Sequence, residues 1–408
     1  MKSLIILRGL DKKAKQNWVK KEKLDNYFLD LEDIIRLYSM PDLLFPEIEI
    51  LGNSFNDVIR KNYLDILLAR LGRGCLVVVD TDDKITDSTL ETLALIYGYS
   101  TFYVIWDIPQ DYLGKPKKYF PSYYRIPNRS ELEKRVSKYL NIQYTSKNII
   151  TKYSDVIDYW KEHGTYLKIS KNDKILHVSD LHSNYSLYKH LPKLGEFKAV
   201  IFHGDYVDGP EKDGSRRLLD IAKNGRGKNT IWLEGNHELR VRKWLALQLV
   251  KGELRDQIYK TIPNDFLTTT AQEFNLDHDA ALDYLREMNK NLKLFAVLED
   301  ENNTFICTHA GLTFPQILDP RYIGNVIYGV REMEKLDSKF SDYTKKDGIW
   351  SIHAHCKYGD NNPQKFNRVI NLDPQSNEEI NYMIRQGTNF RINTLKLKEY
   401  NTYGYKKI

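Results

Sequence analysis

The amino-acid sequence predicts an α/β protein built from two successive units, each with sheet strands flanked by helices. Three observations support this class. Short apolar runs alternate with longer stretches of helical periodicity, which is typical of a parallel sheet covered by helices. The alternation weakens near residue 150 and starts again at residue 174. In the second half, each apolar run ends in polar residues that include His, Asp or Asn.

The first half contains three predicted strands and two predicted helices. The apolar runs at 3–9, 74–83 and 100–109 are rich in Ile, Val and Leu, as expected for buried parallel strands. The stretches 53–72 and 87–99 have the apolar spacing of helices. We therefore predict a first domain over residues 1–150.

The second half contains five predicted strands, at 174–182, 199–209, 229–238, 295–300 and 304–312. A mostly helical insertion at about 239–293 separates the third strand from the fourth. We predict a second domain over residues 151–408.

The amino-acid composition indicates which cellular compartment and which binding partners to expect. Lys and Arg total 61 against 55 Asp and Glu, so the net charge is +6, which only slightly favours a polyanionic partner. Three widely separated cysteines argue against a disulfide framework and for a reducing compartment, so we expect a cytoplasmic protein. The apolar run at the N-terminus is too short for a signal peptide or a membrane span, and we expect no membrane association.

Metal-ligand side chains follow the predicted strands of the second half in a fixed order. The motifs are D-x-H at 180–182, G-D-x-x-D at 204–208, G-N-H-E at 235–238, H-A-G at 309–311 and H-x-H at 353–355. Carboxylate, imidazole and amide donors suit Mn, Fe or Zn. A shared Asp can bridge two such ions about 3.5–4 Å apart. The series therefore predicts a two-metal hydrolase site.

This series of motifs resembles the calcineurin-like metallophosphoesterases, and specifically their phosphoprotein-phosphatase branch, over residues 173 to about 400. The resemblance implies an α/β sandwich of two sheets flanked by helices, and two divalent ions: Mn first, with Fe, Zn, Ni or Co as alternatives. It assigns Asp180 and His182 to the first metal, Asp205 to the bridge, and Asn236, His309 and His353 to the second, with His355 as an extra ligand for the first. It also assigns His237 as the general acid, with Asp208 orienting it.

The sequence departs from that branch at two positions. Gly209 follows Asp208 where the branch carries an Arg that holds the phosphate, and Ile352 precedes His353 where the branch carries Gly. The residues that could replace the missing Arg are Arg216, Arg217, Arg240 and Arg242. Outside the motifs, we expect His177 and His203 to be core residues or to support the ligands, and Cys307 to be a small buried apolar residue.

The N-terminal half contains an incomplete phosphate-binding loop. Residues 9–16 follow a predicted strand with the layout G-x-x-x-x-G-K-[ST], and Lys15 holds the lysine position. Ala14 replaces the second glycine, which restricts the backbone that the phosphate requires, and Gln16 stands where a hydroxyl should reach Mg²⁺. We therefore expect no useful ATP or Mg²⁺ binding here.

The order of elements over residues 1–142 resembles the P-loop kinase domain of phage and bacterial polynucleotide 5′-kinases. The residues nearest to that family's functional positions are Lys15, Glu32 or Asp33, Asp80 and Arg125. We interpret this half as a degenerate kinase that still binds a nucleotide or a nucleic acid.

A kinase-like domain joined to a metallophosphoesterase resembles the end-healing enzymes of RNA repair. The leading hypothesis is therefore a phosphoesterase acting on RNA 3′ ends, on a 3′-phosphate or a 2′,3′-cyclic phosphate, with an RNA ligase on a separate chain as a further partner. Two alternatives stay open. One is a protein Ser/Thr phosphatase or a dinucleoside polyphosphate hydrolase, and the other is a non-catalytic scaffold that recruits nucleic acid or a protein.

Overall fold

The chain forms two compact units, Met1–Tyr144 and Thr145–Ile408, in a computed structural model. The structure describes residues 2–8, 12–31, 34, 52–74, 76–80, 85–105, 160–161, 164–225, 229–312, 327, 348–355, 364–366, 368–374 and 376–399. The predicted α/β class is confirmed in both units. The predicted domain boundary near residue 150 falls outside the described residues and stays a prediction.

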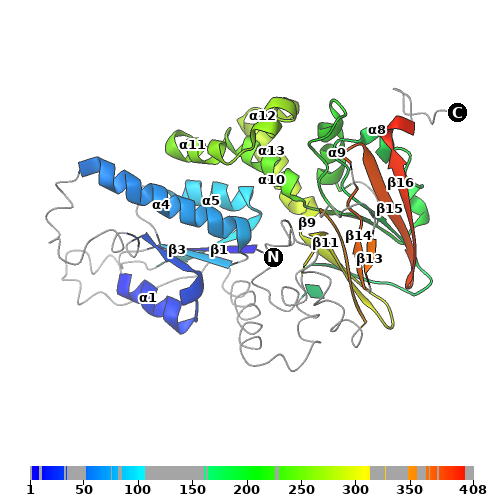
Figure 1. The fold of residues 1–408 in the computed structure, drawn as a ribbon. Helices are drawn as coiled ribbons and strands as arrows, with labels where there is room; N and C mark the ends of the chain where they lie inside the picture. Colours follow the sequence, from blue (N-terminus) through cyan, green and yellow to red (C-terminus); the bar gives the residue numbers. More distant parts are fainter. Residues whose placement is uncertain are drawn as a thin grey trace. The chain divides into compact units, whose positions relative to one another are not determined.

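The first unit is a four-stranded parallel sheet with the strand order β2-β3-β1-β4. Its elements are β1 (Lys2–Arg8), α1 (Lys12–Lys21), η1 (Asp25–Tyr27), β2 (Phe28–Asp30), α4 (Gly52–Arg73), β3 (Leu76–Asp80), α5 (Asp87–Ile96) and β4 (Tyr99–Ile105). Figure 1 shows α4 and α5 over one face of this sheet and α1 on the other. Covering both faces explains why the centre of β1 and all but the last residue of β3 are apolar.

Two predicted boundaries in this unit were wrong. Helix α1 begins at Lys12, so Lys15 lies in its first turn and not in the preceding loop. Helix α5 ends at Ile96 and not at Tyr99, because Gly98 takes a left-handed φ of 71° and Tyr99 already starts β4.

The second unit packs two six-stranded sheets, with the strand orders β13-β14-β12-β11-β10-β5 and β16-β15-β6-β7-β8-β9. The predicted strands correspond to β6 (Lys174–Val178), β7 (Ala199–Phe202), β8 (Thr230–Leu233), β10 (Phe295–Glu299) and β11 (Thr304–Ala310). The sequence did not predict β5 (Thr165–Lys168), β9 (Leu292–Lys293), β12 (Ile349–Ala354), β13 (Gln364–Phe366), β14 (Val369–Asn371), β15 (Glu379–Gln386) and β16 (Asn389–Lys396).

The core of the second unit lies between the two sheets. It combines Ile175, Ile201 and Leu233 from one sheet with Phe305 and Ile352 from the other, together with further aliphatic and aromatic side chains. His177, His203 and Cys307 are fully buried, as predicted. Burial of these apolar side chains holds the two sheets against each other. The polar residues that follow the strands therefore lie at the margin of one shared core.

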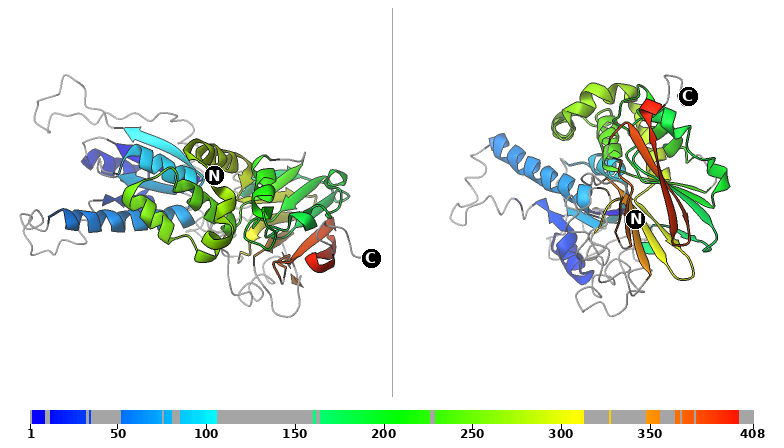
Figure 2. Two further views of the ribbon diagram at one scale, coloured as in Figure 1. Left: turned by 90° about the horizontal axis from the view of Figure 1, so that it is seen from above. Right: turned by 45° about the vertical axis from the view of Figure 1, so that its right-hand side comes forward.

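Helices cover the second unit outside the sheets. They are α8 (Tyr185–Tyr188), α9 (Gly214–Lys223), α10 (Asn236–Ala246), α11 (Gly252–Lys260), α12 (Asn264–Thr269) and α13 (His278–Asn291), with short turns η4 (Leu194–Glu196), η5 (Ala271–Phe274) and η7 (Leu397–Glu399). The predicted insertion is mostly helical, and Figure 2 shows its helices gathered together. In the described part of the chain, no helix is both long and apolar enough to cross a membrane.

Candidate metal centre

The predicted ligands follow strands that run side by side. Strands β6, β7 and β8 are parallel neighbours, so the loops after them meet at one edge of their sheet. The loops after β6 and β7 carry Asp180 and Asp205, and Asn236 is the first residue of α10 after β8. In the facing sheet, β11 and β12 are also parallel and deliver His309 and His353.

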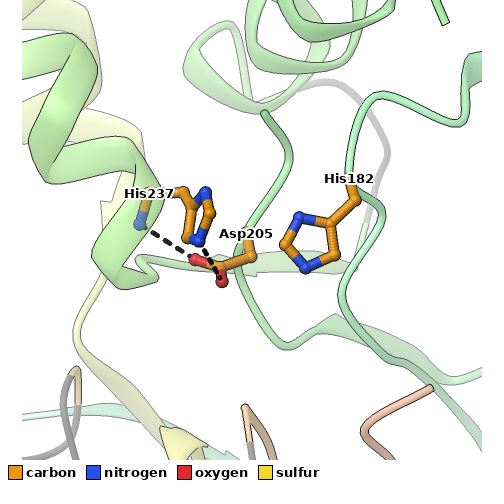
Figure 3. A group of neighbouring side chains, drawn as sticks. All are labelled: His182, Asp205 and His237. Atoms are coloured by element: carbon orange, nitrogen blue, oxygen red, sulfur yellow. Dashed lines mark hydrogen bonds and ion pairs between the residues drawn. The ribbon is translucent and has the colours of Figure 1, made fainter. Parts of the chain in front are cut away.

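Asp205 lies at the centre of the cluster and is buried. Its Oδ1 is 3.5 Å from Nε2 of His309, and its Oδ2 is 3.6 Å from Nε2 of His237 and 4.0 Å from Nδ1 of His355. Ligand atoms close enough to share one cation form two groups, His182 with Asp205 and His237, and Asp205 with His309 and His355. Figure 3 shows the first group, with His182 and His237 on either side of the Asp205 carboxylate.

Two other predicted ligands, Asp180 and Asn236, adjoin this cluster. Oδ2 of Asp180 is 4.0 Å from Nε2 of His182, and its Oδ1 is 3.7 Å from Nδ1 of His309. Oδ1 of Asn236 is 3.0 Å from Nε2 of His309. His353 is fully buried, and its Nε2 has no hydrogen-bond partner among the described residues.

Hydrogen bonds that imidazole N–H groups donate to backbone carbonyls define which imidazole nitrogens are free to bind a cation. Nδ1 of His309 is 2.6 Å from the carbonyl oxygen of His203, and Nδ1 of His182 is 3.2 Å from that of Val207. Since a carbonyl only accepts, each Nδ1 carries the proton and each Nε2 presents a lone pair. The Nε2 lone pair of His309 then faces Oδ1 of Asn236, another acceptor, which is the arrangement that a cation between them would stabilise.

The pKa shifts of the cluster residues also favour a bound metal cation. Burial raises the pKa of Asp180 well above its usual range, and the negative charges of Asp205, Asp373 and Glu238 raise it further. Within the described part of the chain, the buried Oδ1 of Asp180 has no hydrogen-bond partner. Burial lowers the pKa of His182 to about 4, so this imidazole is neutral, as a ligand must be. Buried carboxylates that repel one another beside neutral imidazoles fit a divalent ion.

His237 and Asp208 form a hydrogen-bonded pair at the edge of the cluster. Nδ1 of His237 is 2.7 Å from Oδ2 of Asp208, which leaves Nε2 directed toward Asp205. Burial by itself would lower the pKa of His237, but the Asp205 charge and the Asp208 hydrogen bond raise it overall. Nη1 of Arg240 donates to the same Asp208 oxygen at 2.9 Å and to Asp265 on α12 at 3.3 Å. The helical insertion therefore contacts this pair through Arg240.

Sequence reasoning missed the structural role of Glu238, the last residue of G-N-H-E. Its buried carboxylate accepts hydrogen bonds from the backbone N–H groups of Asp205 at 2.9 Å, Tyr206 at 2.8 Å and Gly235 at 2.8 Å. Burial and the Asp205 charge raise its pKa to about 8, while these N–H donors act in the opposite direction. Glu238 thus joins the loop after β7 to the start of α10. Its place three residues after Gly235 is the sequence signal of a helix cap.

The backbone is strained at several residues of the candidate site. His182, Asp205, Asp208 and His355 all have left-handed φ angles, between 39° and 65°. For residues other than glycine, this conformation costs roughly 1–2 kcal/mol each. These residues belong to the segments that carry the metal-ligand side chains. Their unusual backbone conformation orients those side chains toward one another.

Gly209 explains one departure from the phosphatase pattern. A Cβ atom placed on Gly209 would lie 1.6 Å from the carbonyl oxygen of His182, so this backbone accepts no side chain there. The Arg of the phosphatase branch therefore has no place at this position.

In the first unit, the residues that resemble kinase functional positions come from helix α1 and from the last position of strand β3. Nζ of Lys15 is 2.7 Å from Oδ1 of Asp80, and both side chains are buried. Asp30 is the neighbour of Asp80 across the two strands, and Nε2 of Gln16 lies 3.4 Å from its carboxylate. Glu32, Asp33 and Arg125, which the sequence also singled out, lie outside the described residues.

Comparison with known proteins identifies the class of the second unit. The family model of the calcineurin-like phosphoesterases matches residues 173–385. The chain therefore belongs to the calcineurin-like phosphoesterase family, whose members are metal-dependent phosphoester hydrolases. A search of curated proteins found no match.

Two solved structures resemble the chain weakly. A candidate diadenosine tetraphosphatase shares 17% identity with a TM-score of 0.31, over 57% of this chain and 98% of that one. A conserved uncharacterised protein from Streptococcus pneumoniae TIGR4, a predicted phosphoesterase, shares 12% identity with a TM-score of 0.25, over 58% of this chain and 95% of that one. At these TM-scores, neither likeness bears on the substrate.

Proposed function

We propose that this phosphoesterase uses two divalent ions to act on RNA 3′ ends, removing a 3′-phosphate or opening a 2′,3′-cyclic phosphate. The observation that carries the catalytic part is the buried Asp205 carboxylate, with nitrogens of His237, His309 and His355 within 4.0 Å. The ligands are those proposed from the sequence, except that His355 lies with Asp205 and His309 and would join the second ion. Mn²⁺ is the first candidate. When bound, the ions supply a water of lowered pKa and positive charge for the phosphoryl oxygens.

In this proposal, His237 protonates the leaving group. Its Nδ1 is held by Asp208, so its Nε2 is the nitrogen that faces the cluster. As the water oxygen bonds to phosphorus, the bond from phosphorus to the leaving oxygen breaks, and that oxygen takes the Nε2 proton. The raised pKa of His237 favours the protonated imidazole that this step requires.

Arg240 is the arginine that we propose to hold the substrate phosphate. It lies one helical turn after His237 and contacts Asp208. Two other candidates have different partners: the Arg216 guanidinium pairs with Asp220 and lies over two aromatic rings, and Arg242 is buried against Glu234. The guanidinium carbon of the fourth candidate, Arg217, lies 5.4 Å from the Tyr185 ring.

The RNA part of the proposal rests on the first unit. Its parallel sheet and the position of Lys15 in the helix after β1 support a kinase-like origin. The buried ion pair of Lys15 with Asp80 supports the loss of kinase activity, because the ammonium charge is already neutralised. We therefore propose that this unit binds RNA or a nucleotide and does not transfer phosphate.

Parallel turnover assays test the proposal. With Mn²⁺, we expect hydrolysis of a 3′-phosphorylated oligoribonucleotide or a 2′,3′-cyclic nucleotide to exceed that of a phosphopeptide and a diadenosine polyphosphate. Replacing Asp205 by Ala, or adding EDTA, should lower turnover by several orders of magnitude, whereas replacing the exposed Asp256 by Ala should not. Full turnover of p-nitrophenyl phosphate in chelated protein would refute the metal mechanism. A preference for the phosphopeptide or the diadenosine polyphosphate would refute the RNA assignment.

A further inference from the structure

A tyrosine next to the metal centre holds two cationic side chains. Tyr185 starts α8, and its ring lies 4.4 Å from Nζ of Lys189 and 5.4 Å from the guanidinium carbon of Arg217 on α9. Each such cation–π contact is worth about 0.5–1 kcal/mol at an exposed site. The ring thus positions two flexible side chains that would otherwise sample many conformations.

Both cations are exposed and lack a carboxylate partner. Among the described residues, neither Lys189 nor Arg217 lies within 4.0 Å of a carboxylate oxygen. The acidic side chain of Glu211 lies in the same region, but it accepts hydrogen bonds from the backbone N–H and the hydroxyl of Ser186. The two positive charges are therefore available to an anion from outside the chain.

The cations are linked to the catalytic residues by short contacts. Tyr185 lies three residues after the candidate ligand His182, and its N–H donates to the carbonyl oxygen of Ser183. The Ser183 hydroxyl is 2.6 Å from that of Ser215, which in turn accepts from the backbone N–H of Asp208 at 3.3 Å. Arg217 follows Ser215 by two residues in α9. Both cations therefore lie on the helices that follow the segments of His182 and Asp208 along the chain.

We propose that Tyr185, Lys189 and Arg217, here called the Tyr185 cation site, bind a backbone phosphate of a single-stranded polynucleotide whose end is at the metals. This inference rests on the proposed function and adds the binding site for the flanking nucleotide. A polynucleotide fits because it brings a second phosphate at a regular spacing from the first. A phosphopeptide brings one phosphate, and that phosphate is already engaged at the metals.

The test compares a charge-removing double variant with a matched control. Lys189→Gln with Arg217→Gln removes both cations. Lys171→Gln with Lys174→Gln removes two exposed charges at the start of β6, the opposite end of the strand from the metal ligands. Binding of a 5′-fluorescein oligoribonucleotide with a 3′-phosphate is measured by anisotropy over a range of salt concentrations. The ratio of its kcat/KM to that of p-nitrophenyl phosphate is measured with Mn²⁺.

We expect the Lys189/Arg217 variant to bind the oligonucleotide about tenfold more weakly at low salt, and its kcat/KM ratio to fall by a similar factor. The slope of log affinity against log salt should become shallower by about 0.7 for each phosphate that the variant no longer neutralises. The control variant should keep the ratio and the slope. Tyr185→Phe should preserve binding, whereas Tyr185→Leu should weaken it, because only the aromatic ring attracts the cations.

Failure of this inference can be distinguished from failure of the proposed function. If the double variant matches the control in affinity, slope and ratio, the Tyr185 cation site does not bind the polynucleotide. An equal loss of affinity for an acidic phosphopeptide would replace the polynucleotide by a protein ligand. Absence of metal-dependent p-nitrophenyl phosphate hydrolysis in the unmodified chain would overturn the proposed function, while the anisotropy comparison would still decide the binding site.

Discussion

Restoring the arginine of the phosphatase branch at Gly209 should impair this enzyme. A Cβ atom there would lie 1.6 Å from the carbonyl oxygen of His182, and real Cβ contacts essentially never fall below 3.0 Å. The two groups must therefore separate by at least about 1.4 Å. Since His182 is a candidate ligand whose neighbours contact the loop of Asp205, this movement displaces the metal centre.

The expected loss is large even for the smallest side chain. A misplacement of about 1 Å can cost roughly 10²-fold in rate, so Gly209→Ala and Gly209→Arg should both lower kcat/KM for p-nitrophenyl phosphate by about that factor. Their bound metal content should also fall. Gly195→Ala is the matched control, because a Cβ at Gly195 meets no atom within 4 Å. If Gly209→Arg is as active as the unmodified protein, the steric argument is wrong.

Four other predictions concern proton transfer, the first unit and the core. His237→Ala should lower hydrolysis of an alkyl phosphate by about 10²–10⁴-fold and of p-nitrophenyl phosphate by less, since the phenolate leaves without a proton; equal losses would contradict the general-acid role. The Asp208 hydrogen bond raises the pKa of His237, so Asp208→Asn should move the alkaline limb of the kcat/KM profile to lower pH, and an unmoved limb would assign it to another group. We expect no transfer of labelled γ-phosphate from ATP to a 5′-hydroxyl oligonucleotide; transfer that Lys15→Ala abolishes would show an active kinase. Burial raises the pKa of Cys307 to about 12, so peptide mass mapping should find it alkylated by iodoacetamide only after unfolding.

Local sequence determined the element types and several strands of the fold. Continuous apolar runs such as 199–202 and 305–307 form buried strands, because a strand covered on both faces excludes polar side chains. Strands β15 and β16 were missed. Their sequences mix polar and apolar residues, and although β15 and β16 form a local hairpin, the pairing of β15 with β6 connects residues about 200 positions apart. Such pairings depend on the assembled sheet and leave little signal in a local window.

The sequence by itself determined the chemistry of the metal centre. The tertiary structure decided which other residues contact the ligand-bearing segments. The order of the His, Asp and Asn motifs at strand ends predicted a metal-dependent phosphoesterase, because donor types and strand positions can be read along the chain. Only the fold showed that Glu238 joins two loops and that Arg240 contacts Asp208. It also showed that the backbone around Gly209 excludes an arginine and that Tyr185 gathers two cations. These features depend on the distances between loops. Those distances depend on where the strands lie, and the strand positions result from the packing of the whole core.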